Sequence, residues 1–370
     1  MAAKGGIVTF AGFISSIIDG MKFLRRVGSI LICGMVLLSC EIEGDTIYIN
    51  TDGDDADNAS RDMVFFVSKK GSLGDTGYVD ALYRGVVKGT NGCNTMLSLV
   101  EFPTDTAGAL TTLEYMLDYM QVEKPDRKAL IIIANENFEP VLHRYEQILT
   151  RAQNVDFLLC ESSDTTLPIY TLKIPQYGAY YQAGRMVAEG MADVDSILVV
   201  NANRTDENVA DMSAGFTQAI KDSGTDIYVE NTYLCETSGG YDLASYAYQQ
   251  SYDIDRHFDM VIPLCGGTAQ GYYRYNRENP GSFYTIGVDT DMQLYSTLVP
   301  FSVVKNLEDI LEKWIFSWWS EEELPAHQEF TLASEGSGIV IADSYEEQIG
   351  GIAEKYYDLA VKKEQEYEKQ

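Results

Sequence analysis

Several apolar runs of this chain are followed directly by polar, glycine-rich or aromatic residues, and these residues could carry chemistry. Asp289 and Asp291 follow one such run, and the pair Gly266 and Gly267 follows another. Carboxylates accept hydrogen bonds and can act as acids or bases, whereas glycines let the backbone approach a ligand closely. Other segments of this kind lie at residues 69–78, 135–138, 175–180 and 201–204.

The residues that most enzymes use for catalysis are scarce in this sequence. Its three histidines, His143, His257 and His327, are far apart, and no Cys-x-x-Cys pair occurs, so neither a zinc site nor a His-based catalytic pair is expected. The sequence contains no Gly-x-Ser-x-Gly, His-Glu-x-x-His or P-loop motif. The pair Asp289 and Asp291 remains, but the aspartate cluster with which a nucleoside hydrolase would bind calcium is not apparent. We therefore expect no enzyme, no metal and no cofactor.

The charge of the chain argues against polyanionic partners. Its 27 Lys and Arg residues against 56 Asp and Glu residues give a formal net charge of −29. A field of this sign repels nucleic acid and anionic lipid surfaces, so no nucleic-acid partner is expected. The same charge aids solubility.

The elements that must position the polar segments are strands that alternate with amphipathic helices. Ala129–Ala134 is a nearly continuous aliphatic run, typical of a strand buried on both faces of a parallel sheet. Ala109–Met120 carries apolar residues at helical spacing. The alternation predicts doubly wound parallel sheets. The other predicted strands are 63–67, 96–102, 155–160, 172–174, 196–201, 226–234, 260–264 and 283–288, and the other predicted helices are 78–87, 141–151, 177–191, 209–223, 243–252 and 306–320.

A length of 370 residues exceeds one ordinary core and favours two α/β lobes with a cleft between them. We expect a first lobe at residues 61–171, joined by the helix at about 306–320, and a second lobe at residues 172–300. Residues 321–370 are expected to form a return segment and a C-terminal helix without a site. Ligands of open α/β sheets bind outside the carboxyl ends of the strands, so the polar segments should line the cleft.

Residues 21–40 have the features of a lipoprotein signal peptide. Three basic residues precede a short apolar core, and Leu37-Leu38-Ser39-Cys40 has the form of a bacterial lipobox. The apolar run is too short to span a bilayer. We expect Cys40 to be lipidated, as with palmitate, and to become the new N-terminus; an ordinary secretory signal or short anchor is the alternative. We expect residues 1–20 to reflect an upstream start codon and not a true extension of the protein. The acidic residues 41–60 are expected to form a flexible tether.

Four motifs in register run from about residue 62 to the C-terminus. The strongest is IGVDTD at 286–291, followed by SVVKN at 302–306. The others are GGT at 266–268, the segment 71–85 and the segment 177–184. Together they resemble the basic membrane protein family, lipoprotein solute receptors that include purine nucleoside receptors of ABC importers. This resemblance implies the type I periplasmic binding protein fold, with two doubly wound parallel-sheet lobes.

The resemblance also implies a nucleoside-type pocket. In such a pocket Asp289 accepts hydrogen bonds from ribose hydroxyls, and Lys305 donates to the same sugar or holds Asp289 in place. Tyr78 occupies the position of an aromatic residue that stacks on the base, and Tyr241 is a candidate for the opposite wall. Asp75 would contact the polar edges of the base.

Some positions depart from the family pattern. The loop after the third strand reads NENFE at 135–139, where the family carries Gly, Phe and Asp, and Asn137 and Phe138 are its candidate ligand contacts. Val79 and Met292 stand where the family has Asn and Gln. We therefore expect the sugar-binding end of the pocket to be retained and the base-reading end to be altered.

Each candidate also has a purely structural explanation. Asp289 can end a strand, Lys305 can be a solvated surface lysine, and Tyr78 can pack in the core. Gly266 and Gly267 either let the backbone approach the ligand or serve only a tight turn.

These observations predict an exported, membrane-anchored lipoprotein on the periplasmic side or at the cell surface. It would bind a nucleoside-like small molecule and pass it to an ABC importer permease or another membrane partner. Two alternatives stay open. The chain could be a ligand-sensing receptor for a membrane signalling partner, or a surface nutrient-capture lipoprotein with a non-nucleoside ligand.

Overall fold

The computed structural model describes residues 47–49, 60–74, 76–102, 106–134 and 138–369. Residues 46–370 form one compact unit. The expected extension 1–20 and the signal peptide 21–40 with Cys40 lie outside the described residues. Among the helices of the described ranges, none has both the length and the apolar character needed to cross a bilayer.

The first lobe is built on a seven-stranded sheet in the order β1-β3-β2-β4-β5-β6-β13. Every neighbouring pair is parallel except β1 and β3, which pair antiparallel at one edge. The strands are β1 Ile47–Ile49, β2 Asp62–Lys69, β3 Thr95–Phe102, β4 Ala129–Ile133, β5 Val155–Cys160, β6 Tyr170–Lys173 and β13 His327–Glu329, and the helices are α4 Tyr78–Asn91, α5 Thr106–Glu123, α6 Glu139–Arg144 and α11 Leu307–Trp319.

Helices cover both faces of this sheet because its central strands are apolar on both sides. Val64 and Phe66 of β2 are buried on one face, against α4 and α11. Met63 and Phe65, which alternate with them, are buried on the other face against α5 and α6. This is the doubly wound arrangement that the aliphatic strand patterns predict.

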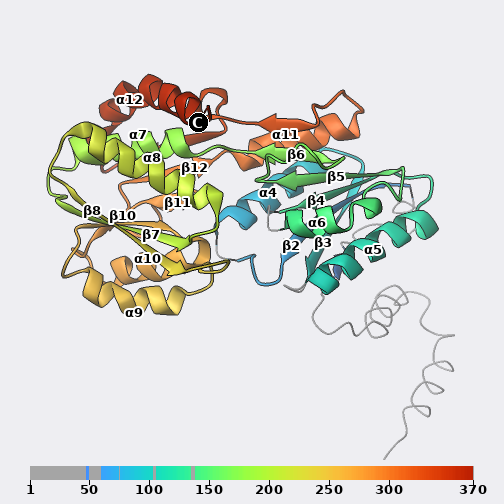
Figure 1. The fold of residues 1–370 in the computed structure, drawn as a ribbon, viewed down its shortest axis with the longest axis horizontal. Coiled ribbons are helices and arrows are strands. Elements are labelled where there is room, and N and C mark those ends of the chain that lie inside the picture. Colours follow the sequence, from blue (N-terminus) through green and yellow to red (C-terminus); the bar gives the residue numbers. More distant parts are fainter. Residues whose placement is uncertain (1–46, 50–59, 75, 103–105, 135–137, 370) are drawn as a thin grey trace, which may run out of the picture. The chain divides into compact units, whose positions relative to one another are not determined.

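The second lobe contains a parallel four-stranded sheet, β10-β9-β7-β8, and a smaller sheet, β11-β12-β14. In the smaller sheet β11 and β12 are parallel and β14 runs antiparallel to β12. Helices α9 and α10 lie on one side of the four-stranded sheet, with α7 and α8 on the other (Figure 1). The strands are β7 Ser196–Asn203, β8 Tyr228–Cys235, β9 Met260–Leu264, β10 Tyr284–Thr285, β11 Gly287–Asp289, β12 Phe301–Lys305 and β14 Ser337–Ile341, and the helices are α7 Tyr177–Gly190, α8 Glu207–Ser223, α9 Ala244–Ile254, α10 Ala269–Glu278 and α12 Glu346–Tyr367.

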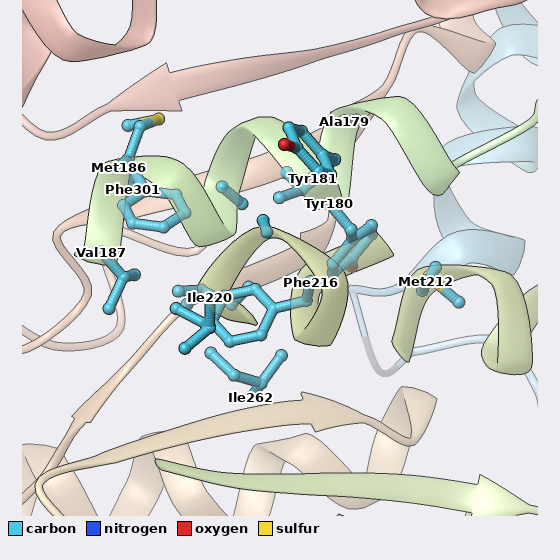
Figure 2. Packing of buried hydrophobic residues seen from close by; sticks show 14 of the residues in the cluster. Ala179, Tyr180, Tyr181, Met186, Val187, Met212, Phe216, Ile220, Ile262 and Phe301 are labelled. Atoms are coloured by element: carbon cyan, nitrogen blue, oxygen red, sulfur yellow. The ribbon is translucent and has the colours of Figure 1, made fainter. Parts of the chain in front are cut away.

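Helices α7 and α8 approach each other closely at two glycines. A Cβ atom on Gly184 would lie 2.7 Å from the Phe216 carbonyl oxygen, and one on Gly215 would lie 2.3 Å from the Tyr177 carbonyl oxygen. Figure 2 shows the side chains that fill the core around this contact, among them Tyr180 and Phe216. Any larger residue at either glycine would force the two helices apart.

The structure corrects several expected boundaries. The strand expected at 172–174 is β6, which pairs with β5 in the first lobe and not in the second. The strand expected at 283–288 is divided into β10 and β11, and three strands that the sequence did not predict, β12, β13 and β14, follow it. The helix expected at 141–151 ends at Arg144 and is followed by a short 3-10 turn, Glu146–Ile148.

The two ends of the chain also differ from the expectation. Within the tether expected at 41–60, residues Ile47–Ile49 form β1 and pair with β3, so this part is not a free linker. The return segment expected at 321–370 is divided between the lobes. Its strand β13 pairs with β6 in the first lobe, whereas β14 joins the second lobe and α12 packs on α7 there.

Helix α12 is fixed to the second lobe by a buried carboxylate. Glu364 is 1% exposed and accepts hydrogen bonds from the backbone N–H groups of Leu332, at 2.8 Å, and Gly178, at 3.2 Å. Burial raises the pKa of Glu364 from 4.5 to about 7, and the two backbone donors oppose this rise only in part.

Replacing Glu364 by Gln should therefore change how the free energy of unfolding depends on pH. Because folding raises the pKa of Glu364 from 4.5 to about 7, the stability that this group contributes is fully present below pH 4.5 and is lost as the pH rises to about 7. Glu364→Gln lacks this titration, so its stability relative to the natural chain should rise by up to about 3 kcal/mol over the same interval. Urea unfolding at a series of pH values measures the difference.

The matched control is Glu347→Gln, an exposed position on the same helix. Its stability relative to the natural chain should change over this pH range far less than that of Glu364→Gln, because Glu347 is exposed. A difference between Glu364→Gln and the natural chain that is constant across this pH range would contradict the assignment.

Candidate ligand-binding site

A buried cluster of charged side chains lies where three strands end. Lys305 is the last residue of β12, Asp289 is the last residue of β11, and Glu161 directly follows β5. The Lys305 Nζ atom lies 3.1 Å from Glu161 Oε1 and 3.6 Å from Asp289 Oδ1. The exposed fractions of the three side chains are 4% for Lys305, 3% for Glu161 and 11% for Asp289. The cluster joins the lobes, because Glu161 belongs to the first and the other two to the second.

The fold brings these residues together by strand pairing and by unusual backbone conformations. Strands β11 and β12 are parallel neighbours, so their carboxyl ends place Asp289 beside Lys305. Glu161 and Asp289 both have a positive φ, 59° and 64°, which is uncommon for residues with a side chain. Strained backbone of this kind concentrates at functional sites, where it sets the direction of a side chain.

The charges of the cluster are not balanced. Among the described residues, one ammonium group, that of Lys305, faces two carboxylates. Oε1 of Glu161 lies within hydrogen-bond distance of Lys305 Nζ, whereas Oε2 of Glu161 and Oδ1 of Asp289 are buried and have no hydrogen-bond partner among the described residues. Burial raises the pKa of Glu161, while the positive charge of Lys305 acts in the opposite direction. The cluster therefore has acceptor capacity that the described protein groups leave unused.

Two tyrosines border the cluster. The Lys305 Nζ atom lies 4.8 Å from the centre of the Tyr78 ring, and the Tyr78 hydroxyl donates a 2.6 Å hydrogen bond to the carbonyl oxygen of Ala134. The Tyr180 hydroxyl is fully buried and has no hydrogen-bond partner among the described residues. Burial raises the pKa of Tyr180 well above its ordinary value, and the charge of Asp289 adds to the effect.

A second contact between the lobes is centred on Thr76, in the loop before α4. Its carbonyl oxygen accepts a 2.7 Å hydrogen bond from the Thr290 hydroxyl. Its own hydroxyl accepts hydrogen bonds from Gln270 Nε2 at 3.2 Å and from the Tyr295 hydroxyl at 3.1 Å. The carboxylate of Asp80 fixes the loop by accepting from the Thr76 and Gly74 backbone N–H groups. The first-lobe loop thus lies directly against residues of the second lobe.

The other candidates have different surroundings. Tyr241 donates a hydrogen bond to Asp206, and its ring packs against Gly266, where a Cβ atom would lie 3.0 Å from the Tyr241 ring. Gly266 has a φ of 52°, so glycine suits the turn that opens α10, and Gly267 lies in the same turn. Phe138 is buried in the core of the first lobe with residues of α5 and β4, which is a packing position. Asp75 and Asn137 lie outside the described residues.

The structure thus brings together Tyr78, Asp289 and Lys305 among the predicted positions. Thr76 and Tyr180 lie within the strand-end segments 69–78 and 175–180 that the sequence singled out, although neither residue was named as a ligand contact. The sequence predictions missed Glu161. A signal for it was available, because the rule that ligands bind beyond strand ends also applies to the residue after the strand predicted at 155–160.

Two cavities lie away from this cluster. The larger, about 430 Å³, lies in the second lobe and is lined by Gln182, Leu332, Gly338, Ile339, Ala353, Glu354 and Tyr357. The smaller, about 310 Å³, lies in the first lobe, where Lys128 contacts the end of α11 and Asp156 accepts a hydrogen bond from the Trp318 indole. No group of three or more His, Cys, Asp or Glu residues in the described ranges is arranged to hold a metal ion.

Residues 63–363 match the family described as ABC transporter substrate-binding protein, PnrA-like. No curated protein sequence matches the chain significantly. Among solved structures, a solute-binding protein of an ABC transporter system from Aeropyrum pernix K1 is similar at a TM-score of 0.66 and 12% identity, covering 82% of this chain and 90% of that chain.

Two further solved structures share the fold. A solute-binding protein of an ABC transporter system from Conexibacter woesei DSM 14684 has a TM-score of 0.56 and 12% identity, covering 81% of this chain and 97% of that chain. A transcriptional activator of the comK gene from Bacillus halodurans has a TM-score of 0.57 and 15% identity, covering 80% of this chain and 97% of that chain. At these identities the likeness concerns the fold, which is the expected periplasmic binding protein type.

Replacing Lys305 by Met should destabilise the fold strongly. The substitution leaves two buried carboxylates without their counter-charge, and breaking a buried ion pair from one side typically costs about 3–5 kcal/mol. The double variant Lys305→Met with Glu161→Gln should recover part of this loss, because it removes one of the stranded charges. Urea unfolding of the single and double variants measures both effects.

The control is Lys88→Met, which breaks the exposed ion pairs of Lys88 with Asp309 and Glu312 on the first lobe. It should change the free energy of unfolding far less than Lys305→Met. Equal losses for the two lysines would show that Lys305 carries no special structural role.

Proposed function

Because the chain belongs to the PnrA-like family of ABC transporter substrate-binding proteins, we propose that its interlobe cluster is the place where it holds its solute. The family establishes a small-molecule ligand, a transporter partner and a solute-binding role, and it is a family of binding proteins and not of enzymes. Membership in it also indicates an extracytoplasmic location.

The observation that carries the proposal is the meeting of charged groups from opposite lobes. Lys305 of the second lobe, which also pairs with Asp289 of that lobe, contacts Glu161 and Tyr78 of the first. A ligand that bonds to groups of both lobes stabilises the arrangement in which they are close, which is how closure around a ligand is driven. Buried acceptors without a donor, such as Glu161 Oε2, give the ligand something to bind.

For the ligand itself we propose a polar molecule with a hydroxyl-bearing part, of the nucleoside type. Hydroxyl donors suit the carboxylate of Asp289, and ligand acceptors suit the ammonium of Lys305. Tyr78 offers an aromatic face, on which Lys305 lies at 4.8 Å in this structure. A ligand base that stacks on Tyr78 would therefore share or displace this cation contact.

For the position in the cell, we propose a lipid anchor at Cys40. The supporting observation is the lipobox at residues 37–40, which follows a basic segment and a short apolar core. Attachment at this cysteine would keep the binding unit, residues 46–370, next to the membrane that holds its transporter.

Replacing Asp289 by Ala should weaken ligand binding by about 2–4 kcal/mol if this carboxylate accepts hydrogen bonds from ligand hydroxyls. This is the size of loss expected when hydrogen bonds to a buried charged group are removed. The measurement is calorimetric titration with the nucleoside that gives the largest thermal shift in a screen of nucleosides, bases, sugars and amino acids.

Asp343→Ala is the matched control, since Asp343 is exposed on a loop of the second lobe. It should bind with the affinity of the natural chain. An unchanged Kd in Asp289→Ala would remove Asp289 from the site, and thermal shifts confined to another ligand class would remove the nucleoside.

Replacing Cys40 by Ala should release the protein from membranes. The variant cannot be acylated at this position, so radiolabelled palmitate should no longer be incorporated and the protein should leave the membrane fraction on centrifugation. A Cys40→Ala protein that still sediments with membranes would contradict the anchor.

A further inference from the structure

Because of Glu161, the site contains a second carboxylate in addition to the pair of Lys305 and Asp289. Its carboxylate comes from the first lobe and contacts Lys305 at 3.1 Å, closer than the 3.6 Å between Lys305 and Asp289. Lys173, at the end of β6, also acts on Glu161, but more weakly than Lys305. Among the described residues, these two buried carboxylates thus share one ammonium group, that of Lys305.

The unused hydrogen-bonding capacity lies on the same two carboxylates. Glu161 Oε2 and Asp289 Oδ1 are buried and accept no hydrogen bond from the described residues, and Glu161 Oε1 lies within hydrogen-bond distance of Lys305 Nζ. Buried acceptors without donors are costly and rare in native proteins. A ligand with several hydrogen-bond donors would satisfy these acceptors.

Both carboxylates are directed by strained backbone at the ends of strands from opposite lobes. Glu161 has a φ of 59° and Asp289 a φ of 64°. This conformation costs free energy at each residue. The buried Tyr180 hydroxyl, also without a described partner, lies close enough for the charge of Asp289 to act on it.

We propose that Glu161 and Asp289 together bind a protonated amino group of the ligand, so that the ligand is a small hydroxylated organic cation. This inference rests on the proposed function, because it concerns the same site. An ammonium group carries three N–H donors and one positive charge, so it satisfies several acceptors at once and balances the two carboxylates together with Lys305. A hydroxyl brings one donor and no charge, and an anionic group would add to the repulsion.

The test compares matched ligand pairs that differ only by an amino group in place of a hydroxyl. Adenosine with 3′-amino-3′-deoxyadenosine, and glucose with glucosamine, are such pairs. Calorimetric titration of the purified chain is made at several pH values around neutrality, because acid that protonates the amine also favours the neutral form of Glu161, whose pKa burial raises. Where both groups are charged, the amino compound should bind tighter by at least about tenfold, the effect of a hydrogen bond to a charged group.

Glu161→Gln should remove this preference by weakening the amino compound while changing the affinity for the neutral compound much less. Glu161→Asp, which keeps the charge, should retain part of the preference, and a circular dichroism spectrum confirms that each variant is folded. The control is Glu312→Gln, an exposed carboxylate paired with Lys88 on the outside of the first lobe. It should keep the full preference.

The possible results separate this inference from the proposed function. If neutral compounds bind as tightly as their amino counterparts, or if Glu161→Gln leaves the ratio unchanged, the amine proposal is overturned while solute binding stands. If no compound of these pairs or of a wider nucleoside and sugar panel binds, the proposed nucleoside-type ligand fails as well.

Discussion

The burial of one ammonium group between carboxylates of two lobes constrains the rest of this structure. A buried charge requires a counter-charge within a few ångströms, and its geometry must be maintained by the surrounding fold. Lys305 obtains its counter-charges from Glu161, after a strand of the first lobe, and from Asp289, at the end of a neighbouring strand. The carboxyl ends of β5 in the seven-stranded sheet and of β11 and β12 in the three-stranded sheet must therefore lie next to each other. The connections between the lobes must allow this placement. The chain meets the requirement by passing between the lobes more than once, with β12 in the second lobe and α11 in the first.

The sequence predicted the general architecture well because the strands of doubly wound sheets appear in the sequence as runs of aliphatic residues. The run 129–134 predicted β4, and the helix expected at 306–320 is α11, placed with the first lobe by its contacts with α4. The errors have a common physical origin. Strand β6 is short and its partner is set by tertiary contacts, so no local pattern shows to which sheet it belongs. The strands β13 and β14 are short and only partly buried, and they lack the aliphatic signal of the central strands.

The site was predictable in part and for a similar reason. Asp289 and Lys305 stand beside strong strand signals, and their pairing follows from the adjacency of β11 and β12. The role of Glu161 depends on the distance between two lobes, which no pattern within either lobe specifies. The same limit applies to Thr76, because its hydrogen-bond partners Thr290 and Tyr295 are more than two hundred residues away in the sequence. Local sequence thus indicates which residues face a cleft, but not which of them meet across it.

The contacts between the lobes are of two physical kinds, and the difference bears on how a binding protein can both close and reopen. The hydrogen bonds of Thr76 are neutral and satisfied within the protein, so they favour contact between the lobes by the modest amount of ordinary hydrogen bonds. The charged cluster acts differently, because among the described residues it buries two carboxylates against one ammonium group and leaves acceptors unsatisfied.

A ligand that supplies donors to those acceptors gains free energy only when the lobes are together, which is the differential affinity that a shift toward the closed state requires. If the cluster were already fully satisfied, the protein would close equally well without its ligand, and ligand binding could not signal occupancy to a partner. If the ligand binds at this cluster as proposed, the incomplete pairing of Glu161 and Asp289 makes closure depend on it.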